Sequence, residues 1–240
     1  METYFDDKEF GRVHIRMTAR AKHYSIKITK GEVWGIIPID GDVNKLVDFI
    51  QSKRKEIKAI LTKRPAPSLI DEQTVMQTAT FQLRIFRTER ENFYMKLDDE
   101  ILSIACPNDT DFKKETVQDL LKNMIVRALR HEAKRVLPNR IIGLAKQHGF
   151  TLTGVKINSS RTHWGSCTGR KSVNLSLHLM ILPWHLINYV LLHELCHTIE
   201  MNHSERFWGL MNQVTDGKAM ALRKELKQYH IINGFQKKTI

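Results

Sequence analysis

Three histidines and three glutamates occur in the segment "VLLHELCHTIEMNHSERFW", residues 190–208. A helix turns by about 100° per residue, so His193 and His197 lie on one face, one turn apart, where both imidazoles can bind the same metal ion. Glu194 lies beside them, in the position of a general base, and is directed too far round the helix to be the third ligand. The segment therefore predicts half of a metal site together with a carboxylate that can take part in catalysis.

His203 is the candidate for the third ligand, although it follows His197 by six residues. On a continuous helix that spacing would point it roughly 120° away from the pair. We therefore expect the helix to end near Met201-Asn202 and Ser204 to cap a second helix. Three imidazole ligands with one open position suit zinc and indicate catalysis. The alternative is a buried helix whose histidines are only hydrogen-bonded.

The composition of the 240-residue chain is that of a globular protein, with 42% hydrophobic and 27% charged residues. The N-terminal residues "METYFDDKEF" lack the layout of a signal peptide, and no apolar run approaches the roughly 18 residues of a membrane span. The cysteines Cys106, Cys167 and Cys196 are an odd, widely spaced set, which favours reduced thiols. These features predict a cytoplasmic protein with no membrane contact.

Residues 12–38 alternate polar and apolar side chains, which predicts strands, with a hairpin turn at Lys30-Gly31. Apolar residues then recur at helical spacing over residues 43–63 and predict one very basic helix, which Pro65 and Pro67 end. Further strand-like segments occupy residues 80–87, 93–97 and 101–105.

A long helical segment begins at Asp111, and a shorter helix follows Pro138 and ends at Gly149. Beyond it, "FTLTGVKIN" (150–158) and "SVNLSLHL" (172–179) predict two strands of a small sheet that lies against the helix with the histidines.

The change in pattern near Pro107-Asn108 predicts a domain boundary. Residues 1–107 are expected to form a β-rich region with one basic helix, and residues 108–240 a helical domain with a small sheet. The expected fold class is therefore α+β.

The segments "SSRTHWGSC" and "YVLLHELCHTIEMNHSERFW", with an Asn-bearing strand and Pro183 between them, resemble the YgjP-like metallopeptidase family, predicted zinc-dependent hydrolases related to the SprT and WLM groups. The resemblance extends through most of the chain and is most specific in these C-terminal motifs. It implies a zincin-like fold for residues 108–240 and places the "WGSC" signature at the border of the cleft. The site residues that it implies are the zinc ligands His193, His197 and His203 and the catalytic carboxylate Glu194.

The reaction implied is attack of a zinc-bound water on an amide carbonyl. Zinc lowers the pKa of the water towards about 7, and Glu194 passes its proton to the leaving nitrogen. A further group must stabilise the oxyanion, and the spacing does not choose among the candidates. The candidates for the cleft or the oxyanion are Arg161, His163, Trp164 and Tyr189.

The net charge of +12 and the pI of 9.7 are the second strong feature of the sequence. Such a surface attracts anions, of which nucleic acid is the commonest large one. The alternative is a solvated basic surface, because the basic runs lie on helix faces without the interleaved aromatic residues that stack on bases. The residues expected in a non-specific nucleic-acid patch are Lys53, Arg54, Lys55 and Lys58.

Three functions are compatible with these features. The first is a zinc metallopeptidase that hydrolyses peptide bonds in a protein or peptide substrate. The second is a nucleic-acid-associated module with a structural zinc, and the third is a zinc amidase that acts on a small molecule. Glu194 favours the first over the second, because a structural site has no use for a carboxylate beside an open coordination position. The third differs from the first only in its substrate.

Overall fold

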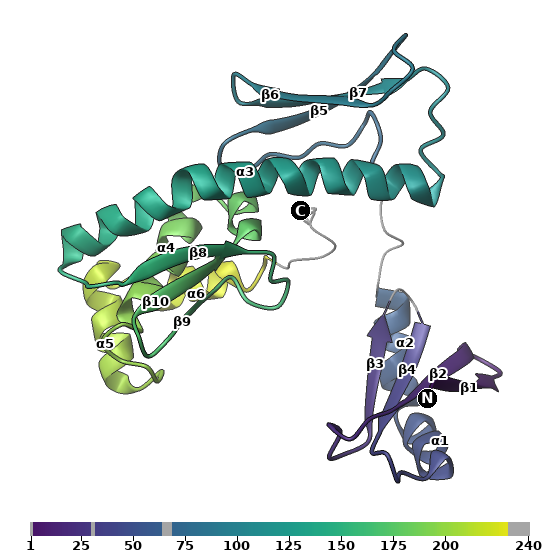
Figure 1. Cartoon of the computed structure of the whole chain (residues 1–240). Coiled ribbons are helices and arrows are strands. Elements are labelled where there is room, and N and C mark those ends of the chain that lie inside the picture. Colours follow the sequence, from purple (N-terminus) through teal and green to yellow (C-terminus); the bar gives the residue numbers. More distant parts are fainter. Residues whose placement is uncertain (1, 30–31, 64–68, 230–240) are drawn as a thin grey trace. The chain divides into compact units, whose positions relative to one another are not determined.

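The structure, a computed structural model, describes residues 2–29, 32–63 and 69–229 (Figure 1). The chain divides into two compact units, Met1–Ser68 and Leu69–Ile240. Each unit has its own hydrophobic core. Helices and three small sheets occur together in the described residues, which confirms the predicted α+β fold.

The division between the units lies earlier in the chain than the boundary expected near Pro107-Asn108. Between residues 69 and 107, apolar residues such as Phe81 and Ile104 pack into the same core as Leu121 of the long helix that follows. The change in sequence pattern at residue 107 is therefore a change of secondary structure inside one core.

The first unit contains a sheet with the strand order β1-β2-β4-β3, formed by β1 (Glu2–Asp7), β2 (Gly11–Met17), β3 (Ser25–Thr29) and β4 (Glu32–Ile37). The pairs β1–β2 and β3–β4 are antiparallel, whereas β2 and β4 are parallel. The antiparallel pairing of β3 and β4 agrees with the predicted hairpin, whose turn at Lys30-Gly31 lies outside the described residues.

Helices α1 (Val43–Ser52) and α2 (Arg54–Lys63) supply the other half of this core. Alternate side chains of β2 and β4 are buried, as expected for a sheet with one covered face. The buried members of this core are Val13, Ile15, Val33, Ile37, Leu46, Ile50 and Ile57.

The sequence predicts one helix over residues 43–63, and this prediction is wrong because a turn at Lys53 separates α1 from α2. The Lys53 backbone adopts φ −100° and ψ 7°, and its N–H bonds to the carbonyl oxygens of Phe49 and Ile50 at 3.1 and 3.2 Å. Ile50 before the turn and Ile57 after it are both buried in the same core. Tertiary packing thus fixes a turn that helical periodicity does not register.

The second unit begins with a sheet of β5 (Gln82–Thr88), β6 (Tyr94–Asp98) and β7 (Ile101–Pro107) in the order β5-β7-β6, close to the three predicted strand segments. The helix α3 (Glu115–His148) follows and ends at Gly149, whose φ of 73° is the left-handed conformation that glycine adopts readily. Figure 1 shows α3 running beneath this sheet and on to the sheet that contains β8.

The predicted break at Pro138 is absent, since α3 continues through it. A proline inside a helix loses one backbone hydrogen bond, and this usually kinks or ends the helix. Here Leu137 and Ile141, on either side of the proline, are fully buried against the core. The burial of these side chains holds the helix together across the proline.

The remaining elements surround the histidine-bearing segment. The sheet β8 (Gly154–Asn158), β9 (Gly165–Cys167) and β10 (Ser172–Ser176) has the order β8-β10-β9, so that β9 is an edge strand, and β9 packs against α4. The helical elements are the 3₁₀ helix η1 (Leu177–Ile181), α4 (Trp184–Cys196), α5 (Glu205–Val214) and α6 (Ala219–Leu226). No helix among the described residues is both long and apolar enough to cross a membrane.

Candidate metal centre

The helix α4 ends at Cys196, five residues before the expected turn at Met201-Asn202. His193 lies in its last turn, and His197 is the C-cap residue. A tight turn follows, because the N–H groups of residues 198 to 200 bond back to the carbonyl oxygens of residues 195 and 196. The predicted N-cap is present: Ser204 Oγ accepts a hydrogen bond of 3.4 Å from the N–H of Phe207 at the start of α5. These two helix ends bring His203 back towards α4.

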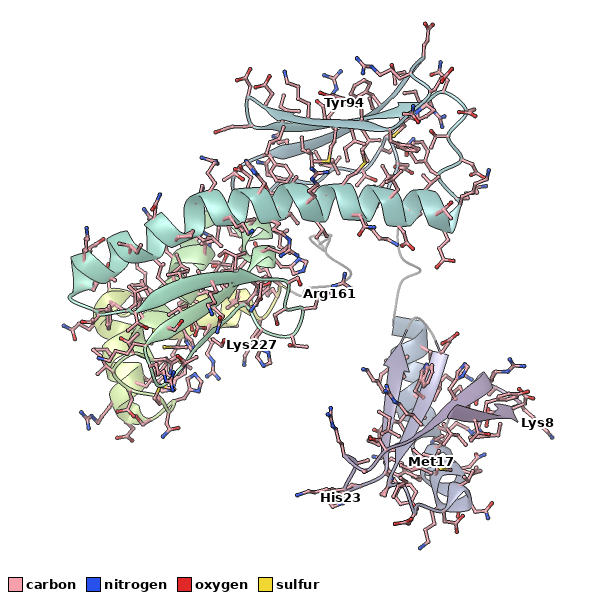
Figure 2. The ribbon with its side chains drawn as sticks, viewed as in Figure 1. Lys8, Met17, His23, Tyr94, Arg161 and Lys227 are labelled. Atoms are coloured by element: carbon pink, nitrogen blue, oxygen red, sulfur yellow. The ribbon has the colours of Figure 1, made fainter. Side chains whose placement is uncertain are left out.

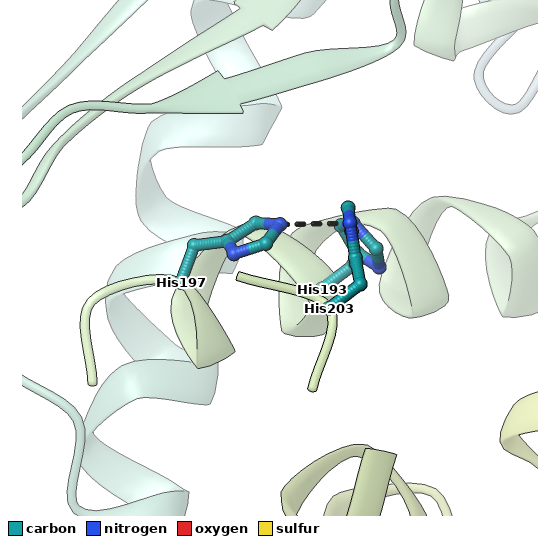
Figure 3. Close-up of side chains that lie close together, drawn as sticks. All are labelled: His193, His197 and His203. Carbon is teal, nitrogen blue, oxygen red and sulfur yellow. Dashed lines mark hydrogen bonds between the residues drawn. The ribbon is translucent and has the colours of Figure 1, made fainter. Parts of the chain in front are cut away.

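The three histidine rings converge on one point (Figure 3). His193 Nε2 lies 3.2 Å from His197 Nε2 and 3.1 Å from His203 Nε2. A neutral ring nitrogen either donates one hydrogen or offers one lone pair, so His193 Nε2 cannot hydrogen-bond to both neighbours at once. Three ligand nitrogens placed tetrahedrally about 2.0–2.1 Å from a zinc ion would lie roughly 3.3 Å apart. The two separations from His193 match this value, and the ligand nitrogens of all three rings lie within 4.8 Å of one another, so the three rings could hold one cation.

Backbone and aromatic groups orient these rings. His197 Nδ1 lies 3.0 Å from the carbonyl oxygen of Glu200, the kind of contact that fixes a metal ligand and its tautomer. His193 Nδ1 is buried and has no hydrogen-bond partner among the described residues. The ring of Phe207, which is fully buried, lies 4.9, 4.6 and 4.8 Å from the rings of His193, His197 and His203. Packing on Phe207 thus complements the single hydrogen bond in holding the cluster.

The protonation of the cluster suits a metal. Burial, followed by the neighbouring His197 and His203, lowers the pKa of His193 to about 3. Burial and then His197 also lower the pKa of His203. Both rings are consequently neutral at neutral pH, which is the form that binds metal ions.

Glu194 is only 5% exposed, and its carboxylate packs directly against the backbone of β9. A Cβ atom at Gly165 would lie 2.7 Å from Glu194 Oε1 and 2.8 Å from Glu194 Cγ, closer than side-chain atoms pack. Burial raises the pKa of Glu194 to about 8, and a cation on the adjacent histidines would act in the opposite direction. The absence of a side chain at Gly165 is therefore what lets the carboxylate occupy this position.

The other sequence-predicted candidates occupy different surroundings. Tyr189 is buried, and its ring lies 6.2 Å from that of His193. Trp164 is half-buried, and its carbonyl oxygen accepts a hydrogen bond of 2.9 Å from the N–H of Ser176. The "WGSC" segment thus reaches the site chiefly through Gly165.

Arg161 and His163 are exposed in the loop between β8 and β9, where Figure 2 marks Arg161. The ring of His163 contacts Thr162 Oγ1 at 2.9 Å. Within the described residues no hydrogen bond or ion pair joins Arg161 or His163 to Glu194 or to the three histidines. The positive charge of Arg161 acts on His178, whose pKa burial lowers to about 4 with a smaller contribution from Arg161.

Sequence reasoning missed three residues of this site. The sequence drew attention to Gly165 only as part of the "WGSC" signature. It drew attention to Phe207 only as part of the first turn of the helix that became α5. Arg223 of α6 carries no sequence signal at all. Its guanidinium lies 4.8 Å above the ring of Trp208, and its charge contributes to lowering the pKa values of His193 and His203. Arg223 thus brings a positive charge to the surroundings of the metal centre.

The basic residues expected in a nucleic-acid patch are largely paired with carboxylates of the same unit. Arg54 lies 2.6 Å from Asp7 and 2.9 Å from Glu9, and Lys58 also pairs with Glu9. Lys53 lies 2.8 Å from Glu56. Lys55 is exposed and has no ion pair among the described residues. The charge available to an external anion on this helix surface is therefore smaller than the sequence suggests.

Three comparisons with known proteins bear on the family of the chain. A family model described as the YgjP-like metallopeptidase domain matches residues 22–229. The search of curated proteins finds no match. Among solved structures, the crystal structure of the metallopeptidase zymogen of Pyrococcus abyssi abylysin is similar, with 19% identity and a TM-score of 0.34 over 38% of this chain and 95% of that chain. Because the family model spans most of the chain and includes the histidine cluster, the chain belongs to the YgjP-like metallopeptidase family.

Proposed function

We propose that the chain is a zinc-dependent peptidase in which Glu194 is the general base. The observation that carries this proposal is the convergence of the Nε2 atoms of His193, His197 and His203 next to a buried carboxylate. Family membership supports a metal-dependent hydrolase and implies a metal ion. The identity of the metal, the role of Glu194 and the class of substrate are the proposed parts.

Zinc is the proposed metal because three imidazoles and an open fourth position are the usual ligand set of catalytic zinc. When bound, such an ion lowers the pKa of water and polarises a carbonyl oxygen. His203 is exposed, whereas His197 is buried, so the open side of the cluster faces solvent near His203. A peptide bond can approach from that side.

The proposed role of Glu194 rests on its position and its acidity. It lies next to His193 on α4, and burial against Gly165 limits its movement. A group that accepts and then donates a proton works best with a pKa near the operating pH. Burial raises the pKa of Glu194 from 4.5 to about 8, and a cation on the adjacent histidines would lower it from that value. In the proposed reaction Glu194 accepts the proton of the attacking water and delivers it to the leaving nitrogen.

A purely structural metal would leave this carboxylate without a purpose. An ionisable side chain that is buried without a salt bridge costs folding free energy. No ion pair to Glu194 occurs among the described residues. Proteins retain such groups mainly at functional sites, and this supports the catalytic proposal over a structural zinc.

The test combines metal analysis with proteolysis assays on the full chain. Glu194→Gln should retain the metal and lose activity by about 10²–10⁴-fold, which is the usual contribution of general-base catalysis. Denatured proteins and cleavage of the chain itself are the first substrates to assay. Glu200→Gln is the matched control, because Glu200 supports His197 through its backbone carbonyl and its own carboxylate lies 3.8 Å from Arg206. A metal-dependent activity that survives in Glu194→Gln would refute the mechanism.

A further inference from the structure

The sheet of the first unit has a second face, opposite the side chains that pack on α1 and α2. Its side chains are exposed or half-buried, in contrast to Val13 and Val33 on the covered face. The described members of this open face that matter here are Tyr4, Arg12, His14, Arg16, Lys27 and Trp34.

The strand register aligns four of these residues in one row across the sheet. Tyr4 lies opposite His14, His14 opposite Trp34, and Trp34 opposite Lys27. The rings of His14 and Trp34 are stacked, with centroids 4.5 Å apart and planes 14° apart. Tyr4 is 53% exposed at the end of the row. The open face therefore carries an aromatic row that ends in a lysine.

Positive charges lie beside this aromatic row. Arg12 and Arg16 are on β2, on either side of His14 along the strand. The guanidinium of Arg12 lies 4.2 Å above the ring of Tyr4 and 4.0 Å from the carboxylate of Asp6. Arg16 and Lys27 are exposed and have no ion pair among the described residues. In the strand register Lys27 lies opposite Trp34, and Arg16 lies opposite Glu2.

Acidic residues occur on both sides of the aromatic row, because Asp6 pairs with Arg12 and Glu2 pairs with Arg16 in the strand register. Glu32 precedes Val33, which pairs with Val13, the residue after Arg12. Glu32 accepts a hydrogen bond of 3.3 Å from Trp34 Nε1 and lies 3.9 Å from His14 Nε2. Asp6 and Glu32 are therefore on the Arg12 side of the aromatic row, and Glu2 is on the Arg16 side.

We infer that this open face binds single-stranded nucleic acid, with bases stacked on Trp34 and Tyr4 and phosphates contacted by Arg16 and Lys27. Exposed aromatic side chains interleaved with cations form the surface on which unpaired bases stack, whatever their sequence. An acidic peptide would use the cations but not the rings, and the paired bases of a duplex cannot reach the rings. On the helix surface with Lys53, Arg54, Lys55 and Lys58, the half-buried ring of Phe10 lies 4.9 Å from the Arg54 guanidinium, which covers it.

The test is fluorescence anisotropy with a labelled oligothymidine single strand and the full-length chain at low salt. Trp34→Ala should weaken binding roughly tenfold, within the range for loss of one base–aromatic stack. Trp34→Phe should retain most of the affinity because the ring is preserved. Lys55→Ala, an exposed and unpaired lysine of the helix surface, is the matched control and should change affinity little. Circular dichroism verifies that each variant is folded.

Salt dependence separates the phosphate contacts from the stacking contacts. Each phosphate contact to a single strand contributes about 0.7 to the slope of log affinity against log salt concentration. Arg16→Ala should therefore reduce the slope by about 0.7. Trp34→Ala should lower the affinity and leave the slope unchanged. Because Arg16 is an exposed surface residue, the salt dependence of Arg16→Ala remains informative even if Trp34→Ala fails to fold.

Any of the following results would overturn the inference: no binding of the single strand at low salt, equal or tighter binding of a duplex, a larger loss in Lys55→Ala than in Trp34→Ala, or equally effective competition by polyglutamate. His203→Ala should leave oligonucleotide binding intact, because the two sites are in different units. Loss of binding in that variant would assign the nucleic acid to the metal centre and overturn the inference, without affecting the proposed peptidase function.

Discussion

In the second unit, the buried ring of Phe207 lies within 4.9 Å of three histidine rings, whereas in the first unit Trp34 stacks on one histidine, His14, on an open sheet face. Both clusters combine histidine with an aromatic ring, but the first has three histidines and the second has one. Burial keeps His193 neutral, with its Nε2 directed at two other nitrogens. On the open face, His14 instead faces the carboxylate of Glu32 at 3.9 Å. The comparison shows that the convergence of three imidazoles, together with the burial of His193, is what makes the first cluster suitable for a metal.

Measurement of metal content is the most direct test of this comparison. His193→Ala should remove most of about one zinc per chain, because only two imidazole ligands remain. His14→Ala should leave the metal content unchanged, since His14 belongs to the other unit. Inductively coupled plasma mass spectrometry of the purified variants measures both. Retention of a full equivalent in His193→Ala would disprove its assignment as a ligand.

Stability should also differ between the two aromatic clusters. Phe207→Ala should lower the free energy of unfolding by about 3–5 kcal/mol, because it removes a fully buried ring from the core. Tyr4→Ala removes a ring that is 53% exposed and should cost less than about 1 kcal/mol, including its contact with Arg12. Urea titration of the metal-free proteins compares the two. Similar losses of unfolding free energy in the two variants would contradict the difference in burial between Phe207 and Tyr4.

A pair of glycine substitutions tests whether the packing of Glu194 on β9 matters for activity. Gly165→Ala should retain the metal and reduce peptidase activity by about 100-fold, since displacement of a catalytic group by about 1 Å costs that much. Gly209→Ala is the control, because no atom lies within 4 Å of the Cβ position at this residue in α5. Metal content and rates are measured on the same preparations. Normal activity in Gly165→Ala would show that β9 does not position the carboxylate.

The smallest expected effect is a pH-dependent stability difference in the metal-free protein. Folding raises the pKa of Glu194 from 4.5 to about 8, so the folded state binds the proton more tightly and loses stability as the pH rises through this window. Glutamine has no such dependence. The Tm of Glu194→Gln minus that of the wild type should therefore increase between pH 5 and pH 8.

The control for this measurement is internal. His193 has its pKa lowered from 6.5 to about 3, so its contribution is lost as the pH falls below 6.5, and it is present in both proteins. A Tm difference that stays constant from pH 5 to pH 8, measured by thermal unfolding after treatment with a chelator, would show that Glu194 is not buried as described.

Local sequence signals predicted much of the metal centre. The spacing of His193 and His197 requires only helix geometry, and Ser204 signals a helix start through its own side chain. The convergence of His203 follows from these two facts once the first helix ends. Only the position of that end was misplaced, because the apolar run gives no sign of a helix that stops at Cys196.

Features that depend on contacts between distant segments could not be predicted. Nothing in the sequence pairs Gly165 with Glu194, since their contact exists only when β9 packs against α4. Pro138 was expected to end a helix because its backbone effect is local, whereas the burial of Leu137 and Ile141 is not. The predicted domain boundary near residue 107 differs from the observed division after Ser68 for the same reason. A change from strands to helix is visible in sequence, but membership in one core is not.

The timing of assembly follows from where the site residues lie along the chain. All three histidines fall between residues 193 and 203, so the ligand cluster needs only one helix end and one turn to form. Contacts at such short sequence separation close quickly. Glu194, by contrast, reaches its packed position only when β9, which precedes α4 in the chain, packs against that helix. The histidine cluster therefore depends on local closure of the chain, whereas the placement of Glu194 depends on contact between two separate elements.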